Sequence, residues 1–226
     1  MRVTHAAETS RRYRGGRTNH ERIFEVSDHP QEAGRRFLED LPGHLQFERP
    51  PREARLSARI EVSPVAALFR RITLGVYAVG VTDGQRSDAF TAAWVMQASF
   101  NPLILAISIN PDNASYELLH ATGGFTVNVL KGDQLDLARR LGTRSGRDED
   151  KLVGVRTHPG RLGSPILEEA LAYFECELMG RTRAGDHELV LGRVVDGKIL
   201  DPAATPLTYA DTGEMDGSSA LFPRKL

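Results

Sequence analysis

The sequence predicts a mainly β protein with short helices, in which an antiparallel barrel carries the helices in its connections. Three observations support this fold class. Six strand-like runs follow residue 62, and several of them alternate apolar and polar residues as half-buried antiparallel strands do. The helical segments among them are few and short. Strands and helices do not alternate, which argues against doubly wound and TIM-barrel architectures.

The first expected element is a short helix over residues 64–72, where Ser63 suits the N-cap and Pro64 suits the first turn. Two β-rich runs follow at 74–82 and 89–97. The polar sequence DGQRSD between these runs predicts a hairpin loop, so we expect the two runs to pair.

The rest of the chain adds four strands, two helices and a further helical turn. The last two strands meet at Ala184-Gly185, which predicts a hairpin, and Gly123 marks the end of the first of these helices. The expected strands are 103–109, 125–130, 171–182 and 186–195, the helices are 115–121 and 134–141, and the turn is 148–153.

The composition limits the classes of function. The 226 residues include 29 Lys and Arg against 30 Asp and Glu, a net charge of -1, which gives no electrostatic basis for general nucleic-acid or anionic-membrane binding. No apolar run is long enough to span a bilayer, and no secretory signal is visible. We therefore expect a soluble, cytoplasmic protein with no nucleic-acid or membrane partner.

Cys176 is the only cysteine, which excludes an internal disulfide and any site built from several cysteines. It stands between Glu175 and Glu177 at an alternating strand position, where the two carboxylates disfavour its thiolate. We expect a buried structural thiol. The seven histidines are scattered without metal-ligand spacing, so no metal is expected.

A change of composition near residue 60 predicts a domain boundary. Residues 1–60 are dense in Arg, His, Glu and Pro and have few bulky apolar residues, which is typical of a poorly ordered extension. Residues 61–212 hold all the predicted strands and form the expected folded domain. Residues 213–226 are then a C-terminal tail.

Common catalytic motifs are absent. The chain has no Walker A loop, no G-x-G-x-x-G after a strand, no H-E-x-x-H and no G-x-S-x-G. No nucleophilic triad stands out either. These absences argue against a nucleotide kinase and a zinc hydrolase.

One candidate ligand site combines a strand with a later helix. The segment from Thr91 to Pro102 has small residues where a flat ligand could approach the backbone, with hydroxyl and amide groups at either end. Beyond it, residues 110–115 open a helix, whose free N–H groups suit a phosphate. Together the two pieces would suit a mononucleotide. Neither piece alone identifies a ligand site, because Ser115 also suits a plain N-cap and Trp94 also suits a core position.

A second candidate is Gly185-Asp186-His187, at a hairpin turn that enters a strand. His187 would there lie at the rim of the barrel, where it can donate a hydrogen bond to a ligand. Gly185 and Asp186 equally suit a tight turn that needs no function. The residues alone leave both interpretations open.

Taken in order, these stretches resemble the flavin reductase-like family, the FMN-binding split-barrel proteins. The resemblance covers about residues 63–212, and its order and spacing are far more specific than any single piece. The segment Ala92-Ala93-Trp94 looks more similar to flavoredoxin-like proteins and diflavin-protein reductase domains than to the commonest Ser-rich versions, and Leu103 stands where many relatives have a second proline. The matching segments are 75–81, 89–102, 115–119, 124–130, 185–187 and 192–195.

The resemblance implies a fold and a role for each matching residue. The fold would be a six-stranded antiparallel Greek-key split barrel, usually a homodimer with flavin near the subunit interface. By this resemblance, the isoalloxazine ring would lie along Thr91, Ala92, Ala93 and Trp94, and its edge or the ribityl chain would contact Gln97 and Ser99. The phosphate would be held by Asn113 and Ser115, and the nicotinamide would lie beside His187.

Two basic residues, Lys151 and Arg86, are candidates to stabilise negative charge on a reduced flavin. An ordinary surface charge is the alternative interpretation of each. Lys151 is the one that we assign to cofactor binding.

The activity implied by the resemblance is that of an NAD(P)H:flavin oxidoreductase. Such a flavin reductase transfers a hydride from NADH or NADPH to FMN, or to FAD, and can supply reduced flavin to a monooxygenase partner. The alternative is an FMN-binding electron-transfer protein that holds its flavin tightly and has little direct NAD(P)H activity.

Overall fold

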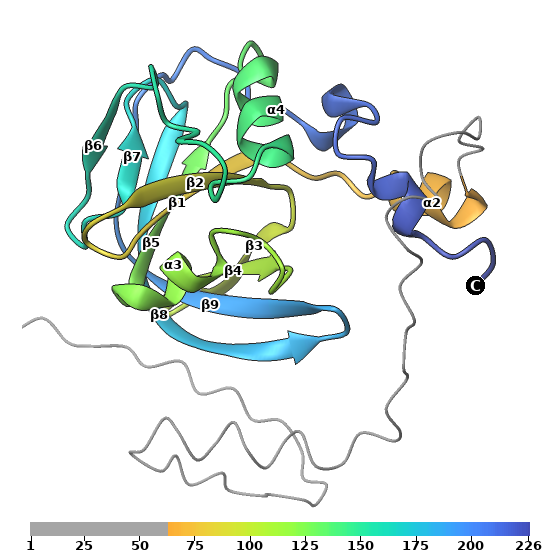
Figure 1. Ribbon diagram of the computed structural model, residues 1–226, viewed down its shortest axis with the longest axis horizontal. Coiled ribbons are helices and arrows are strands. Elements are labelled where there is room, and N and C mark those ends of the chain that lie inside the picture. The colour runs from red at the N-terminus through yellow and green to blue at the C-terminus, as the bar shows by residue number, and fades with distance from the viewer. Residues whose placement is uncertain (1–62) are drawn as a thin grey trace, which may run out of the picture. The chain divides into compact units, whose positions relative to one another are not determined.

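Seven strands form one antiparallel sheet in the computed structural model, which describes residues 63–226 (Figure 1). The order across this sheet is β2-β1-β5-β8-β9-β4-β3, and β6 (Thr157–Pro159) pairs with β7 (Pro165–Leu167) in a second sheet. The predicted extension, residues 1–60, lies outside the described residues. The strands of the main sheet are β1 (Tyr77–Thr82), β2 (Ser87–Ala92), β3 (Val95–Phe100), β4 (Leu103–Ile109), β5 (Gly124–Val129), β8 (Ala172–Ala184) and β9 (His187–Ile199).

The connections require this sheet to close into a barrel. β2 and β3 stand at opposite ends of the strand order, yet only Ala93 and Trp94 link them along the chain. So short a link brings the two edges of the sheet together. After β4 the chain returns beside β1 as β5, which is the long return of a Greek key. The predicted mainly β, antiparallel fold is confirmed.

One expected strand is in fact two. The run 89–97 divides, with β2 ending at Ala92 and β3 beginning at Val95, so the main sheet has seven strands rather than six. The prediction fails here because neither Ala93 nor Trp94 is a typical turn-forming residue, and the apolar run continues through them. The pair β6–β7 is also missing from the prediction, since strands of 3 residues carry no readable alternation.

The helices are short, as predicted, and lie in the connections. Ser63 caps the first of them, since its hydroxyl oxygen accepts the Val65 N–H at 3.2 Å. Gly123, with a φ of 71°, follows the second and ends it in the left-handed conformation that favours glycine. The helices are α2 (Pro64–Phe69), α3 (Tyr116–Ala121), α4 (Leu135–Thr143) and the 3-10 helices η2 (Tyr209–Thr212) and η3 (Ser218–Leu221).

Apolar side chains cover both faces of the sheet around β1. Val79 and Val81 point into the barrel, where they pack with Phe125 of β5. Ala78, on the opposite face of the same strand, packs with Leu141 of α4 outside the barrel (Figure 1). Alternate side chains of β1 therefore pack in two layers, one inside the barrel and one beneath α4, and the outer layer fixes α4 against β1 and β2.

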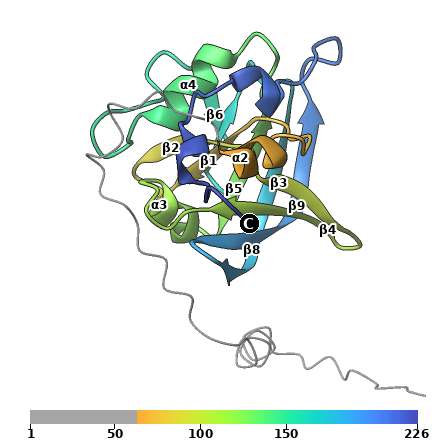
Figure 2. The same ribbon diagram turned by 90° about the vertical axis from the view of Figure 1, so that its right-hand side faces the viewer.

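The two ends of the described chain pack on each other (Figure 2). Phe69 of α2 and Phe222 after η3 have ring centroids 5.3 Å apart. The Ser63 hydroxyl donates to the Pro223 carbonyl oxygen at 2.6 Å. The segment 213–226 is thus held against the first helix.

Candidate functional site

Three of the predicted site segments meet at one end of the barrel. The β4–β9 ladder pairs Ile109 with Glu188, so the turn 110–115 leaves β4 beside the start of β9, where His187 stands. Trp94 belongs to the same end, because its carbonyl oxygen accepts the N–H of the residue before Ile109 at 2.9 Å. Strand register therefore brings together segments that are far apart in the sequence.

Trp94 and His187 form a ring pair at this rim. Their ring centroids lie 4.8 Å apart, with the planes tilted by 58°. Trp94 is 49% exposed, so one side of the pair is open to a ligand. His187 Nδ1 lies 2.9 Å from Asp186 Oδ1, which places the hydrogen of a neutral ring on Nδ1 and leaves Nε2 to bond with a ligand.

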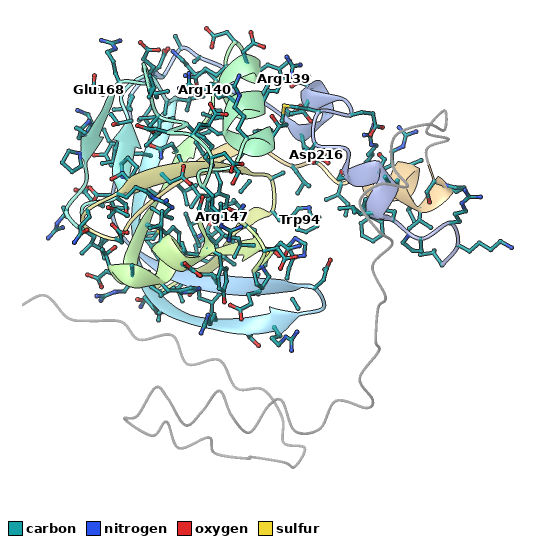
Figure 3. The ribbon with its side chains drawn as sticks, viewed as in Figure 1. Trp94, Arg139, Arg140, Arg147, Glu168 and Asp216 are labelled. Carbon is teal, nitrogen blue, oxygen red and sulfur yellow. The ribbon has the colours of Figure 1, made fainter. Side chains whose placement is uncertain are left out.

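A pocket of about 720 Å³ shares the turn 110–115 with this rim. Its other walls are β2, the end of α4 and the loop that follows α4. Three predicted cofactor-binding residues line it, namely Thr91, Asn113 and Lys151. Arg147 lines it too, and Figure 3 places Arg147 and Trp94 between α4 and the β8–β9 hairpin. The volume is typical of sites for small molecules and cofactors.

Buried Asp88 ties the walls of this pocket together. Its Oδ2 accepts the Ser115 hydroxyl at 2.6 Å, and its Oδ1 lies 3.3 Å from Lys151 Nζ. Lys151 Nζ also donates to the Leu141 carbonyl oxygen at 3.4 Å. The Lys151 and Asp88 side chains are 2% and 4% exposed. One carboxylate therefore holds the strand, the turn and the loop in a single arrangement.

Lys151 is a buried charge, and the interpretation of Lys151 as a surface charge is wrong. Burial lowers the pKa of Lys151, and the charge and hydrogen bond of Asp88 oppose that lowering. Asp88 and Leu141 use two of the three Nζ donors, and Lys151 is one of the residues that line the pocket. Arg86, the other basic candidate, is exposed in the β1–β2 loop and does not line the pocket.

Ser115 occupies the N-cap position of α3, but its side chain does not cap the helix, because its hydroxyl donates to Asp88 instead. It is 0% exposed and supports the turn 110–115 from behind. The pocket wall contains its neighbours Asn113 and Ala114 but not Ser115. The phosphate role expected of Ser115 is therefore indirect in this geometry.

The remaining predicted residues lie outside the pocket wall. Ala92 is buried in the barrel interior, and Ala93 is half-buried in the link to β3. Gln97 is exposed on β3, where its side-chain amide donates to the Ser99 carbonyl oxygen at 3.4 Å. Gln97 and Ser99 therefore do not line the pocket that Thr91, Asn113 and Lys151 share.

The sequence analysis missed Asp88, Gly146 and Arg147. Asp88 looks like part of a polar hairpin loop, and only the fold shows that it is buried. A Cβ at Gly146 would collide with the Asp88 carboxylate, so glycine lets the loop close over that group. Arg147 has no carboxylate partner within the part of the chain that the structure describes. A basic side chain without a partner in a pocket suits an anionic ligand.

A second pocket, of about 780 Å³, lies on the other side of α4 and contains none of the predicted site residues. Its arginines are mostly committed to carboxylates on the protein. The pairs are Arg139 with Asp136 at 3.1 Å, Arg144 with Glu149 at 2.9 Å and Arg156 with Glu169 at 2.5 Å. Arg144 lines both pockets, and the pocket beside the turn 110–115 also contains the carboxylates of Asp112 and Asp148. The second pocket contains no residue of that turn, so it is the weaker candidate.

Residues 63–226 contain no group of three or more His, Cys, Asp or Glu side chains that could hold a metal ion. No helix in the described region is long and apolar enough to cross a membrane. Cys176 is free and buried, and burial, with the Glu175 charge, raises its pKa to about 12. The expected buried, inert thiol is therefore confirmed.

Comparisons with known proteins identify the family of the chain. The model of the flavin reductase like domain matches residues 69–218. Over 196 residues the chain is 36% identical to the putative diflavin flavoprotein A 6 of Nostoc sp., an alignment that covers 86% of this chain and 31% of the relative. The chain therefore spans less than a third of that relative's length.

Two solved structures share the fold. An FMN-binding protein from Thermus thermophilus with bound 1-cyclohex-2-enone has a TM-score of 0.60 and 30% identity, covering 70% of this chain and 92% of that chain. The NADH:FAD oxidoreductase SgcE6 of Streptomyces globisporus, in complex with NAD and FAD fragments, has a TM-score of 0.59 and 26% identity, covering 67% and 92%. Both similarities extend over most of those two proteins.

Proposed function

This chain belongs to the flavin reductase-like domain family, and from that premise we propose that it is an NAD(P)H-dependent flavin reductase that binds FMN. One observation carries the proposal. The Trp94–His187 ring pair and the pocket organised by Asp88 share the turn 110–115, so a flat ring system and a phosphate would each meet suitable residues.

The residues present fit a flavin mononucleotide. The pocket offers the cations Arg147 and Lys151 and the amide of Asn113 to a phosphate. Thr91 stands on β2, three residues before the half-exposed Trp94, where a ring could lie along the link to β3. A pocket of about 720 Å³ lies within the range of cofactor sites.

The protein's part in the reaction would be binding and orientation. When bound, flavin supplies the redox chemistry and accepts a hydride from a reduced nicotinamide. His187 Nε2 would hold the nicotinamide against the ring, with Asp186 keeping the imidazole in its orientation. Arg147 would neutralise the phosphate, with Lys151, whose charge is paired with Asp88, in the same pocket wall. Hydride transfer needs no general acid from the protein, so loss of these residues should weaken binding and alignment.

We also propose that the protein is a homodimer. Met96 and Phe100 of β3 are 58% and 85% exposed, and Leu103 of β4 is 51% exposed. Apolar side chains gathered on one edge of a barrel suit a second copy of the same chain. Size-exclusion chromatography with light scattering would test the oligomeric state.

A second candidate function has a specific observation in its favour. The relative with 36% identity is a diflavin flavoprotein, of which this chain matches only part. A reductase domain of that kind would keep its flavin and pass electrons to a protein partner. Release of reduced flavin would instead suit supply to a monooxygenase.

An absorption spectrum followed by reduction would test the proposed function. We expect the protein mixed with FMN to retain flavin absorption after gel filtration, or to turn over added FMN, and NADH or NADPH to bleach it without oxygen. Rapid bleaching with multiple turnovers of added FMN indicates the reductase. Retained flavin that bleaches slowly indicates the electron-transfer alternative, and failure to bind any flavin contradicts both.

Arg147→Ala should weaken binding of FMN about tenfold, since a charge-assisted bond to phosphate is lost, roughly 1.4 kcal/mol. Binding of riboflavin, which lacks the phosphate, should not change. Dissociation constants from flavin fluorescence quenching would measure both. Arg139→Ala is the matched control, because Arg139 lines the other pocket and already pairs with Asp136. An equal loss for FMN and riboflavin would contradict the assignment of Arg147 to the phosphate.

A further inference from the structure

A polar cluster joins α3 to the outer part of the β8–β9 hairpin. The Tyr116 hydroxyl donates to Glu188 Oε2 at 2.7 Å. Arg181 Nη1 donates to the Tyr116 hydroxyl, lies 3.4 Å from the same Glu188 oxygen and 3.3 Å from His120 Nε2. The pocket wall includes none of these four side chains, so the proposed reaction leaves the cluster without a role.

Glu188 holds both ends of the turn 110–115. Its backbone pairs with Ile109, the last residue of β4. Its carboxylate accepts the hydroxyl of Tyr116, the first residue of α3. The Glu188 side chain is 17% exposed, so this charge-assisted bond is partly shielded from water. Figure 1 shows α3 lying close to the hairpin that carries Glu188.

Bonds within the turn fix its shape but not its place. Asn113 Oδ1 accepts the Ser115 N–H at 2.9 Å, and Asn110 Oδ1 accepts the Asp112 N–H at 2.9 Å. Both bonds would survive a shift of the whole turn away from β9. Its place is set from behind by Asp88, and from the side by the Tyr116–Glu188 bond.

We propose that Tyr116 and Glu188 are positioning residues for the phosphate of the bound flavin, with Arg181 steadying the Glu188 carboxylate. This inference rests on the proposed function, in which the turn 110–115 receives the phosphate. The two residues act through the turn and lie outside the pocket wall. Their loss therefore weakens binding of a phosphorylated flavin and leaves binding of the unphosphorylated flavin unchanged.

The test compares FMN with riboflavin on the full chain. Dissociation constants are measured by flavin fluorescence quenching for the wild type, Tyr116→Phe, Glu188→Ala and the double variant. We expect each single variant to lose five- to tenfold of the preference for FMN over riboflavin. The double variant should lose no more than the larger single loss, because both changes remove the same bond.

Arg183→Ala is the matched control. Arg183 lies on the same strand as Arg181 and opposite Glu188 in the β8–β9 register, outside the cluster. It should keep the wild-type preference. A variant that is merely destabilised would bind both flavins less well, and thermal unfolding measures that effect separately.

Two further outcomes would separate the proposals. A wild type that prefers FMN, together with single variants that keep the full preference or with additive losses in the double variant, overturns the positioning role alone. A wild type that binds FMN no better than riboflavin overturns the phosphate site of the proposed function, and the positioning role with it.

Discussion

Asp88→Asn is expected to lower the free energy of unfolding by about 3–5 kcal/mol at neutral pH, the usual cost of leaving a buried charge without its partner. Lys151 would lose its counterion while its side chain stays 2% exposed, and the Ser115 hydroxyl would lose a carboxylate acceptor. Chemical denaturation followed by circular dichroism measures the change. In a domain of this size the expected fall in melting temperature is roughly 6–20 °C.

The loss of stability caused by Asp88→Asn should become smaller at alkaline pH. Burial already lowers the pKa of Lys151 from its ordinary value of 10.5, and removal of the opposing Asp88 charge lowers it further. The unfolded chain then binds the proton more readily than the folded chain. Stability therefore rises as the pH increases through the folded-state pKa towards 10.5. Denaturation curves between neutrality and about pH 10 would show the variant approaching the wild type.

A double variant separates the lost ion pair from lost packing. Asp88→Asn combined with Lys151→Met removes both charges and keeps similar volumes, so no buried charge is left unpaired. We expect the double variant to be more stable at neutral pH than Asp88→Asn alone. A double variant as unstable as the single one would mean that the stability resides in the hydrogen bonds of Asp88 to Ser115 and Ala89.

The sequence could reveal the parts of the site that depend on strand order. Trp94, His187 and the turn 110–115 stand at the ends of runs whose alternation and turns are visible, and antiparallel pairing brings such ends together. The break at Ala93 was invisible for the converse reason. Barrel closure rather than local turn chemistry decides where β2 stops.

Burial of polar residues could not be predicted in the same way. Ser115 has the sequence signature of a helix cap, but the deep carboxylate of Asp88 competes for its hydroxyl. Lys151 stands in the strongly charged stretch DEDK, where a solvated cation is the natural expectation. The burial of Lys151 depends on the loop after α4 folding over β2, and the bond of Ser115 depends on the turn 110–115 packing against β2. No local pattern encodes either long-range contact.

His187→Ala should lower the rate of flavin reduction by NADH or NADPH about 100-fold, the scale of effect that follows from misplacing a reacting group by about 1 Å. Binding of FMN should change less than threefold, because the pocket residues Asn113, Arg147 and Lys151 are untouched. Anaerobic stopped-flow bleaching of the FMN-loaded protein gives the rate, and fluorescence titration gives the affinity. His158→Ala is the matched control, since His158 lies on β6 with its side chain 49% exposed.

The accessibility of Trp94 provides an independent measurement on His187→Ala. Trp94 is the one tryptophan in the chain, and its ring meets only the His187 ring among the aromatic pairs of residues 63–226. Loss of the imidazole should make Trp94 more accessible to acrylamide quenching, whereas His158→Ala should leave its accessibility unchanged. If Trp94 becomes more accessible while the reduction rate holds, the ring pair is structural and His187 does not align the nicotinamide. If FMN affinity falls as far as the rate does, His187 serves the flavin instead, because only a nicotinamide-aligning residue leaves flavin binding intact while slowing its reduction.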